Sequence, residues 1–230
     1  MTKIGRSILA LLNDVVYRYG DYDKMAIAMT LGLDSFFREK FTSLVSRPGR
    51  CTVLDLGSGT GRNVPFLLRH NSSIRIVLLD LSIHGLRRAK ERFQQHVQVD
   101  LVCASAELLP LRCSSIHAAV SSYMLRQVRT CILARELRRV LRGDGVAVIV
   151  DFWRSTSALR TILLLTYLAV IVPLEALMLC PTSWHAYRRL WRELIRLPPP
   201  TQVSELFSRY FRRVKLFTFN NFVFLWVLSR

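Results

Sequence analysis

Thr52-Val-Leu-Asp-Leu-Gly-Ser-Gly-Thr-Gly-Arg62 is the stretch that decides the fold of this 230-residue chain. Its apolar run, residues 53–56, has the length and composition of a buried strand. The three glycines that follow at alternate positions are Gly57, Gly59 and Gly61. Glycine lets the chain turn sharply there and lets a ligand lie against bare backbone. Apolar residues at helical spacing over 64–68 then predict that this loop leads into a helix.

Strands and helices alternate after this loop. Further strands are predicted over residues 74–80, 97–102, 116–121 and 146–150, and a closing hairpin over 214–219 and 222–228. Residues 131–142 have the apolar spacing of an amphipathic helix, and Gly143-Asp-Gly145 is expected to turn the chain into the next strand. This order predicts a Rossmann-like α/β fold, a mostly parallel sheet with helices on both faces and a C-terminal antiparallel hairpin.

Small or acidic residues stand where the predicted parallel strands end. They are Gly57, Asp80, Ser105, Ser121 and Asp151. Ligands of such sheets bind beyond the carboxyl ends of the strands, so we expect these residues to line one crevice. A carboxylate at the position of Asp80 can accept both ribose hydroxyls of a nucleoside, whereas a single acid there can also be a helix cap.

The glycine pattern distinguishes between two kinds of nucleoside site. A dinucleotide loop reads G-x-G-x-x-G, but Arg62 occupies the third glycine position. The G-x-G-x-G form preceded by Asp55 resembles instead the cofactor loop of class I methyltransferases. This resemblance implies S-adenosylmethionine (SAM) as cofactor, with a glycine-rich loop that binds nothing as the alternative. The implied cofactor-binding residues are Asp55, Gly57, Ser58, Gly59, Gly61, Asp80, Leu81, Ser105, Ala106, Glu107 and Ser121.

The charge of the chain is strongly positive. Thirty-three Lys and Arg against sixteen Asp and Glu give a net charge of +17, and from residue 184 onward nine basic residues accompany two acidic ones. Such a field attracts nucleic acid or an anionic membrane face, unless it only reflects a generally basic proteome. The five cysteines are scattered without a C-x-x-C pair, so neither disulfides nor a metal site is indicated and a cytoplasmic location is expected.

One apolar run, residues 161–174, raises the question of a membrane. Its fourteen residues fall short of the ~20 that span a bilayer, and Pro173 and Glu175 interrupt it. We expect a buried helix, an interfacial segment or the wall of an apolar pocket rather than a transmembrane helix. Together with the basic C-terminal region, this run predicts peripheral association with an anionic membrane surface.

Four stretches carry a more specific signature. They are Tyr22-Asp-Lys-Met25 with Met29-Thr-Leu-Gly-Leu-Asp34 and Phe37-Arg38, Tyr123-Met-Leu-Arg-Gln-Val128, Arg139-Val-Leu-Arg-Gly-Asp-Gly145, and Ala186-Tyr-Arg-Arg with Ile195-Arg-Leu-Pro198. They are similar, in order, to Y-D-x-M-N…M-S-F-G-L-D…W-R, F-G-L-R-N-V, R-V-L-K-P-G-G and A-Y-R-Y-L…I-x-x-F-P of the UbiE-type C-methyltransferases of ubiquinone and menaquinone biosynthesis. The resemblance implies a seven-stranded class I methyltransferase that acts on a prenylated quinol of the demethylmenaquinol or ubiquinol-precursor type.

The chain departs from this family pattern at several positions. Ala26 replaces the Asn after Y-D-x-M, and Ser105 replaces the acid that would reach the adenine amino group. Met124 and Gln127 replace the Gly and Asn of F-G-L-R-N. A hydroxyl can still accept the adenine hydrogen bond, although more weakly than a carboxylate.

Methylation of a quinol ring carbon requires an ionised ring hydroxyl, and hence a base and a cation for the phenolate. We expect Arg126 to supply the cation, because its guanidinium stays charged and offers a fork of donors. Asp151 is the candidate base, directly or through water, and Tyr22 is expected to close over the site and orient the ring hydroxyl. The alternatives for the base are His84, His117 and His185.

The predicted organisation is one domain in four segments. They are an N-terminal helical lid (1–45), a SAM-binding core (51–152), an apolar and basic helical insertion (153–200) and a C-terminal helix end with its hairpin (201–230). Three rival functions stay open: methylation of another lipid or small apolar acceptor, an RNA-binding methyltransferase, and SAM binding without catalysis. Aromatic residues that alternate along the hairpin favour a core-packed strand over an RNA-stacking platform. Whether the protein forms a homo-oligomer is also left open.

Overall fold

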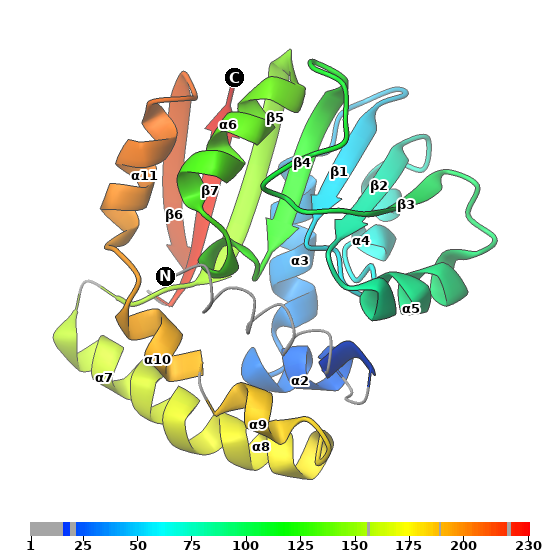
Figure 1. The fold of residues 1–230 in the computed structure, drawn as a ribbon. Coiled ribbons are helices and arrows are strands. Elements are labelled where there is room, and N and C mark those ends of the chain that lie inside the picture. The colour runs from blue at the N-terminus through cyan, green and yellow to red at the C-terminus, as the bar shows by residue number, and fades with distance from the viewer. Residues whose placement is uncertain (1–15, 19–21, 156, 189, 220–221) are drawn as a thin grey trace.

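A seven-stranded sheet in the order β3-β2-β1-β4-β5-β7-β6 forms the centre of the computed structural model (Figure 1). The structure describes residues 16–18, 22–155, 157–188, 190–219 and 222–230. The strands are β1 (Thr52–Leu56), β2 (Arg75–Asp80), β3 (Val99–Cys103), β4 (Ile116–Ser122), β5 (Leu141–Phe152), β6 (Arg213–Phe219) and β7 (Val223–Ser229). The first five pair in parallel, and β7 runs antiparallel to both β5 and β6. The predicted Rossmann-like sheet with a closing antiparallel hairpin is therefore confirmed.

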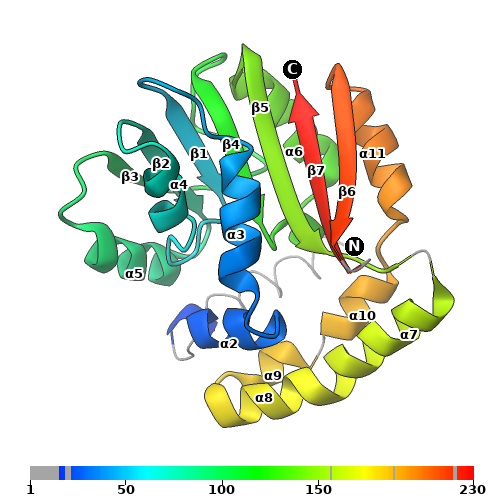
Figure 2. The same ribbon diagram turned by 180° about the vertical axis from the view of Figure 1, so that it is seen from behind.

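Helices cover both faces of the sheet, as Figures 1 and 2 show from opposite sides. One face packs against α6 (Thr130–Val140) and α11 (Pro200–Ser208), with Leu137 and Phe207 fully buried in the shared core. The other face packs against α3 (Asp34–Ser43), α4 (Val64–His70) and α5 (Ile83–Phe93). Because side chains alternate along a strand, neighbouring residues of one strand serve the two cores: Leu54 belongs to the first and Val53 to the second.

A third layer lies across the carboxyl ends of the parallel strands (Figure 1). It comprises α2 (Tyr22–Met29), α7 (Ala158–Thr166), the π-helical turn η2 (Tyr167–Ile171), α8 (Val172–Leu179), α9 (Trp184–Tyr187) and α10 (Leu190–Ile195). A separate apolar cluster holds this layer together, with Met25, Leu168 and Leu194 among its buried residues. The layer thus covers the edge of the sheet where ligands of such folds bind.

The apolar run forms one helix through α7, η2 and α8, so the expected interruption at Pro173 and Glu175 was wrong. Proline lacks an amide hydrogen and its ring collides with the preceding turn of an α-helix. Here the amide of Val172 donates to the carbonyl of Tyr167, five residues back, and this wider turn accommodates Pro173 without ending the helix. The 22-residue helix Ala158–Leu179 has a mean hydropathy of 2.4 and is long and apolar enough to cross a membrane, with 22% of its window buried.

Two further details differ from the sequence prediction. The predicted helix over 131–142 ends at Val140, and β5 already begins at Leu141. The expected turn at Gly143-Asp-Gly145 lies inside β5, where the pairing with β4 shifts register between Ile116 and Ala118. In the hairpin, Trp226 and Phe224 are buried in the core and Phe217 is half exposed, as expected for a core-packed strand rather than a stacking platform.

Candidate functional site

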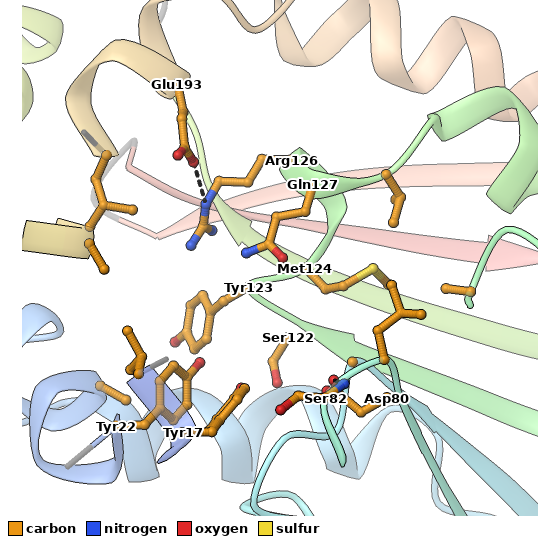
Figure 3. A pocket seen from close by; sticks show the side chains of 18 of the residues that line it. Tyr17, Tyr22, Asp80, Ser82, Ser122, Tyr123, Met124, Arg126, Gln127 and Glu193 are labelled. Atoms are coloured by element: carbon orange, nitrogen blue, oxygen red, sulfur yellow. Dashed lines mark hydrogen bonds and ion pairs between the residues drawn. The ribbon is translucent and has the colours of Figure 1, made fainter. Parts of the chain in front are cut away.

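A cavity of about 480 Å³ lies between the carboxyl ends of β1, β2, β4 and the covering helices (Figure 3). Its volume falls in the range of ~300–1,000 Å³ that is typical of small-molecule sites. One wall comes from the glycine loop and the end of β2, with Gly57, Asp80 and Ser82. The opposite wall comes from η1 (Leu125–Gln127) and α10, with Arg126 and Glu193.

The glycine loop can only be built from glycine at its critical positions. Gly57, Gly59 and Gly61 all have positive φ, where L side chains are strained. A Cβ on Gly57 would lie 2.7 Å from Cγ of Met124, and one on Gly59 would collide with the ring of Tyr17. Met124, where the family pattern has glycine, therefore packs directly against the loop and lines the same cavity.

Asp80 is fixed on the cavity wall by two backbone donors. Its Oδ2 accepts the amide of Gly59 at 2.8 Å and its Oδ1 accepts the amide of Ser82 at 2.8 Å. These two hydrogen bonds orient the carboxylate on the cavity wall. The strand-end acid thus joins the glycine loop to the start of α5, and it stands at the strand end where nucleoside sites hold the acid that binds ribose.

Asp55 lies beneath the loop and outside the cavity. It is fully buried, its Oδ1 accepts from Nδ2 of Asn63 at 2.9 Å, and its Oδ2 has no hydrogen-bond partner among the described residues. Burial raises the pKa of Asp55 to about 7, although the hydrogen bond from Asn63 and the charge of Arg38 lower it. An acid at this position is therefore close to half-protonated at neutral pH.

The other proposed cofactor residues divide into three groups. Leu81, Ser105, Ala106 and Glu107 line the cavity beside Asp80. Ser58, Gly59 and Gly61 belong to the loop but not to the cavity lining. Ser121 faces away: its hydroxyl donates to the carbonyl of Leu56 at 3.0 Å, and the next residue, Ser122, lines the cavity instead.

Arg126 is held by two acids. Asp151, fully buried behind it, accepts from its guanidinium, from its backbone amide at 3.1 Å and from the amide of Phe152 at 2.8 Å. Glu193 lines the cavity, and its Oε2 lies 3.9 Å from Nε of Arg126 (Figure 3). Burial lowers the pKa of Arg126, but the two acids outweigh it and raise the pKa. Asp151, the predicted base, lies outside the cavity lining, and its carboxylate accepts hydrogen bonds from Arg126 and Phe152.

Glu193 is the one of these acids that reaches the ligand space. Burial raises the pKa of its carboxyl above the ordinary value, while the neighbouring Arg126 lowers it. Its side chain is 15% exposed. A carboxylate with a raised pKa that lines a cavity beside a fixed guanidinium has the properties of a general base.

Three tyrosines form the floor between these walls. Tyr22 and Tyr17 lie with ring centroids 4.7 Å apart, and both line the cavity. Tyr123 stacks on Phe152 at 5.1 Å, has a φ of 62° and carries a buried hydroxyl without a hydrogen-bond partner in the described part of the chain. Burial raises the pKa of all three phenols, so their hydroxyls stay protonated.

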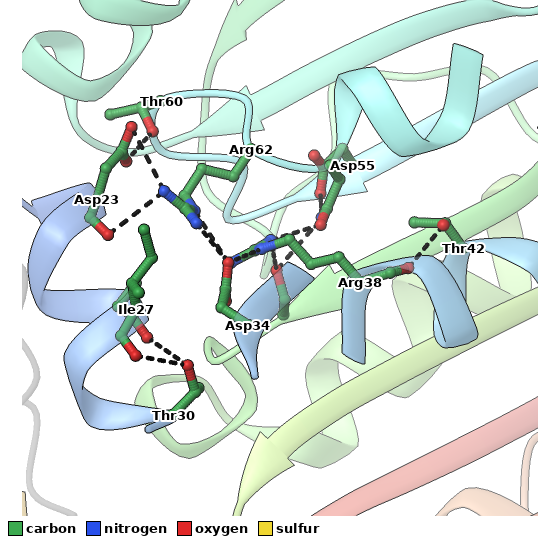
Figure 4. A network of polar contacts seen from close by, with 12 residues as sticks. Asp23, Ile27, Thr30, Asp34, Arg38, Thr42, Asp55, Thr60 and Arg62 are labelled. Carbon is green, nitrogen blue, oxygen red and sulfur yellow. Dashed lines mark hydrogen bonds and ion pairs between the residues drawn. The ribbon is translucent and has the colours of Figure 1, made fainter. Parts of the chain in front are cut away.

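A network of charges ties the N-terminal helices to the glycine loop (Figure 4). Asp34 pairs with Arg38 at 2.7 Å and with Arg62 of the loop, and both partners of the Asp34–Arg38 pair are almost fully buried. Arg38 also donates to Asn63 and, at 3.1 Å, to Ser122. The family motifs around Asp34 and Arg38 thus meet the loop through this network.

Several residues of the site escaped the sequence prediction. Glu193, Ser122 and Tyr123 line the cavity, and Arg38 is buried behind it. Arg38 and Tyr123 stand in the family motifs, and this position could have identified them as site residues. No motif in the sequence pointed to Glu193. The three histidines considered as bases do not line the cavity, and Nδ1 of His117 accepts the amide of Thr52 at the opposite end of β1.

Residues 7–220 match the sequence model of the ubiE/COQ5 methyltransferase family. A mitochondrial 2-methoxy-6-polyprenyl-1,4-benzoquinol methylase of Caenorhabditis elegans is 29% identical over 61% of this chain and 52% of its own length. The UbiE ubiquinone/menaquinone biosynthesis C-methyltransferase of Desulfotalea psychrophila is 33% identical over 57% of this chain and 54% of its own. The chain thus spans about half the length of these two relatives. A demethylmenaquinone methyltransferase of Thermotoga maritima is 28% identical over 80% of both chains.

Solved structures match the same fold at low identity. A SAM-dependent methyltransferase from Aquifex aeolicus superposes with a TM-score of 0.57 at 15% identity, over 84% of this chain and 88% of that one. Geranyl diphosphate C-methyltransferase from Streptomyces coelicolor gives a TM-score of 0.55 at 16% identity, over 86% and 76% of the two chains. The expected family resemblance, methyltransferase fold and SAM as cofactor are confirmed by these comparisons together.

Proposed function

Because this chain belongs to the ubiE/COQ5 methyltransferase family, we propose that it transfers a methyl group from SAM to a ring carbon of a prenylated quinol. The observation that supports this most directly is the composition of the main cavity. A nucleoside-type wall with Gly57 and Asp80 faces an acid–guanidinium pair, Glu193 and Arg126, across one space. The names of the relatives favour a quinol as the acceptor.

The residues of the first wall fit the cofactor. Gly57 of the glycine loop lines the cavity, and the side chain of Met124 packs closely against it. Asp80 is oriented by two amides and suits the ribose hydroxyls, and Ser105 with Ala106 lies beside it where the adenine ring would be bound. When bound, SAM supplies an electrophilic methyl group.

The second wall prepares the acceptor. Glu193 takes the proton of a ring hydroxyl, and Arg126 stabilises the negative charge that this leaves on the oxygen and the ring. After methylation the ring carbon loses its hydrogen as a proton to water, and Glu193 returns its proton to the ring oxygen, which restores the aromatic quinol. Tyr22 lines the same space and can donate a hydrogen bond to the ring oxygen, because its own phenol stays protonated. Asp151 holds Arg126 in place from behind. The protein contributes mainly position and charge to an in-line displacement.

An exposed apolar surface supports peripheral association of the protein with a membrane, where an acceptor with an isoprenoid tail would be found. The helix Ala158–Leu179 leaves an apolar stripe uncovered, with Leu174 55% and Met178 83% exposed. Exposed apolar patches of this kind mark protein or membrane contacts, and the basic charge of the chain suits an anionic lipid face.

The test begins with calorimetric titration of the purified protein with S-adenosylhomocysteine, in parallel with Asp80→Ala. We expect binding by the wild type and at least a tenfold loss in the variant. Methyl transfer from radiolabelled SAM is then measured with a demethylmenaquinol, a ubiquinol precursor, a phospholipid amine and RNA. Label in a quinol supports the proposal, and label in the phospholipid or RNA alone overturns it in favour of those acceptors.

A further inference from the structure

A second cavity, of about 230 Å³, lies next to the main one at the junction of α7 with the turn between α2 and α3. Its lining is apolar apart from Thr30 and Tyr167. Both hydroxyls donate inside the protein, Thr30 to the carbonyl of Ala26 at 2.9 Å and Tyr167 to the carbonyl of Ala28 at 3.3 Å. The cavity therefore offers a ligand apolar contact and little else.

Met29 and Phe152 line both cavities, so the two spaces share a boundary. Phe152 follows Asp151 directly and stacks on Tyr123, which faces the acceptor space. The two cavities therefore adjoin at the side chains of Met29 and Phe152.

The mouth of the second cavity is apolar too. Leu31 is 73% exposed, Leu33 43% and Leu163 58%, and all three line the cavity. Leu31 has a φ of 51°, and the turn that contains it holds the leucine outward. Leu163 belongs to the helix whose uncovered side continues through Leu174 to Met178, so the mouth opens onto the apolar stripe.

The volume of the second cavity indicates how much of a ligand it can hold. At about 230 Å³ the second cavity is below the ~300–1,000 Å³ of sites that enclose a whole small molecule, so it accommodates a segment. The main cavity, about 480 Å³, must hold both the cofactor and the acceptor ring under the proposed function. An acceptor with a long apolar tail therefore needs a further apolar space beside the ring site.

We propose that the second cavity binds the first part of the acceptor's isoprenoid tail and leads the remainder across the apolar stripe to the lipid. This inference rests on the proposed function for its substrate class. Met29 and Phe152 then form the passage between ring and tail, and Leu31, Leu33 and Leu163 form the exit. Tail and ring recognition are thereby assigned to separate sets of residues.

The experiment compares two acceptors with the same quinol ring, one with a tail of four isoprene units and one without a tail, in detergent micelles. Leu163→Trp places a bulky apolar side chain at the mouth, where burial draws it into the cavity. Ile162→Trp is the matched control, because its site is 60% exposed on the same helix and lies outside the cavity lining. Leu33→Trp narrows the cavity from the opposite wall.

With Leu163→Trp and Leu33→Trp we expect the KM for the tailed acceptor to rise about tenfold, an effect equal to the loss of about two buried methylenes. The tail-less acceptor should keep its KM, Ile162→Trp should match the wild type, and S-adenosylhomocysteine should bind all variants equally. Equal KM values for the tailed acceptor in all four proteins would overturn the tail site. Wild-type protein that methylates neither quinol would contradict the proposed function instead, and the tail site with it.

Discussion

The hydroxyl of Thr60, in the glycine loop, donates a 2.7 Å hydrogen bond to the carboxylate of Asp23 in α2. The same carboxylate accepts from Arg92 of α5 at 2.6 Å and lies 3.7 Å from the guanidinium of Arg62. The side chain of Asp23 therefore contacts Thr60 in the glycine loop, Arg62 just after it, and Arg92 in α5. These contacts connect α2 to the cofactor loop. A substitution in α2 should therefore change the affinity of the protein for its cofactor.

Asp23→Asn is predicted to weaken the binding of S-adenosylhomocysteine about tenfold. The amide keeps the size of the side chain but loses the charge that holds two guanidinium groups, and hydrogen bonds to charged groups contribute about 1.5–3 kcal/mol. Calorimetric titration measures the change. Asp144→Asn is the control, since that acid pairs with Arg47 on an exposed surface and should leave the affinity unchanged. Equal affinity of Asp23→Asn and wild type would mean that the loop is positioned without α2.

Glu193→Gln is predicted to lower kcat for the quinol by about 10²–10⁴, the usual contribution of a general base. The binding of S-adenosylhomocysteine should not change, because Glu193 lies on the acceptor wall. Burial raises the pKa of Glu193, so wild-type kcat should fall as acidification protonates it, and this acid limb should be absent from the pH profile of the variant. Glu205→Gln, on the exposed side of α11, serves as control. A variant with wild-type kcat and an unchanged acid limb would exclude Glu193 as the base.

The apolar stripe predicts a measurable membrane affinity. Leu174→Asp combined with Met178→Asp should lower co-sedimentation with anionic vesicles at least tenfold, since each leucine or methionine withdrawn from lipid forfeits about 1.5–3 kcal/mol. Val97→Asp is the control, because Val97 is 95% exposed just before β3 and does not belong to the helix Ala158–Leu179. If the double variant sediments with vesicles as well as the wild type does, this face does not contact lipid.

Site residues could be predicted from the sequence where neighbouring residues in the chain determine their position. The glycines and Asp80 could be predicted because the turn and the strand-end carboxylate are specified within a few residues. Glu193 could not, because only the packing of α10 over the sheet brings it to Arg126. Ser121 was chosen over Ser122 because the orientation of a strand's last residues depends on register. The helix through Pro173 was missed because a single π-helical turn, invisible to apolar periodicity, absorbs the proline.

Asp55 predicts an unusual pH dependence of stability. Its pKa is about 7 in the folded protein and near 3.8 when the chain is unfolded, so the folded state binds more protons between these values. The free energy of unfolding therefore loses this contribution as the pH rises from about 4 to 7, by at most roughly 4 kcal/mol at 1.36 kcal/mol per pKa unit. Asp55→Asn removes the cost of the buried charge and keeps an acceptor for Asn63.

Thermal unfolding of wild type and Asp55→Asn at pH 5 and pH 8 isolates this contribution from the other acids. The variant should gain stability relative to wild type on going from pH 5 to pH 8, because only the wild type must ionise a fully buried carboxyl. Asp100→Asn, in an exposed pair with Arg75, should show no comparable divergence. A constant difference in melting temperature between Asp55→Asn and wild type at the two pH values would mean that Asp55 titrates as an ordinary carboxyl.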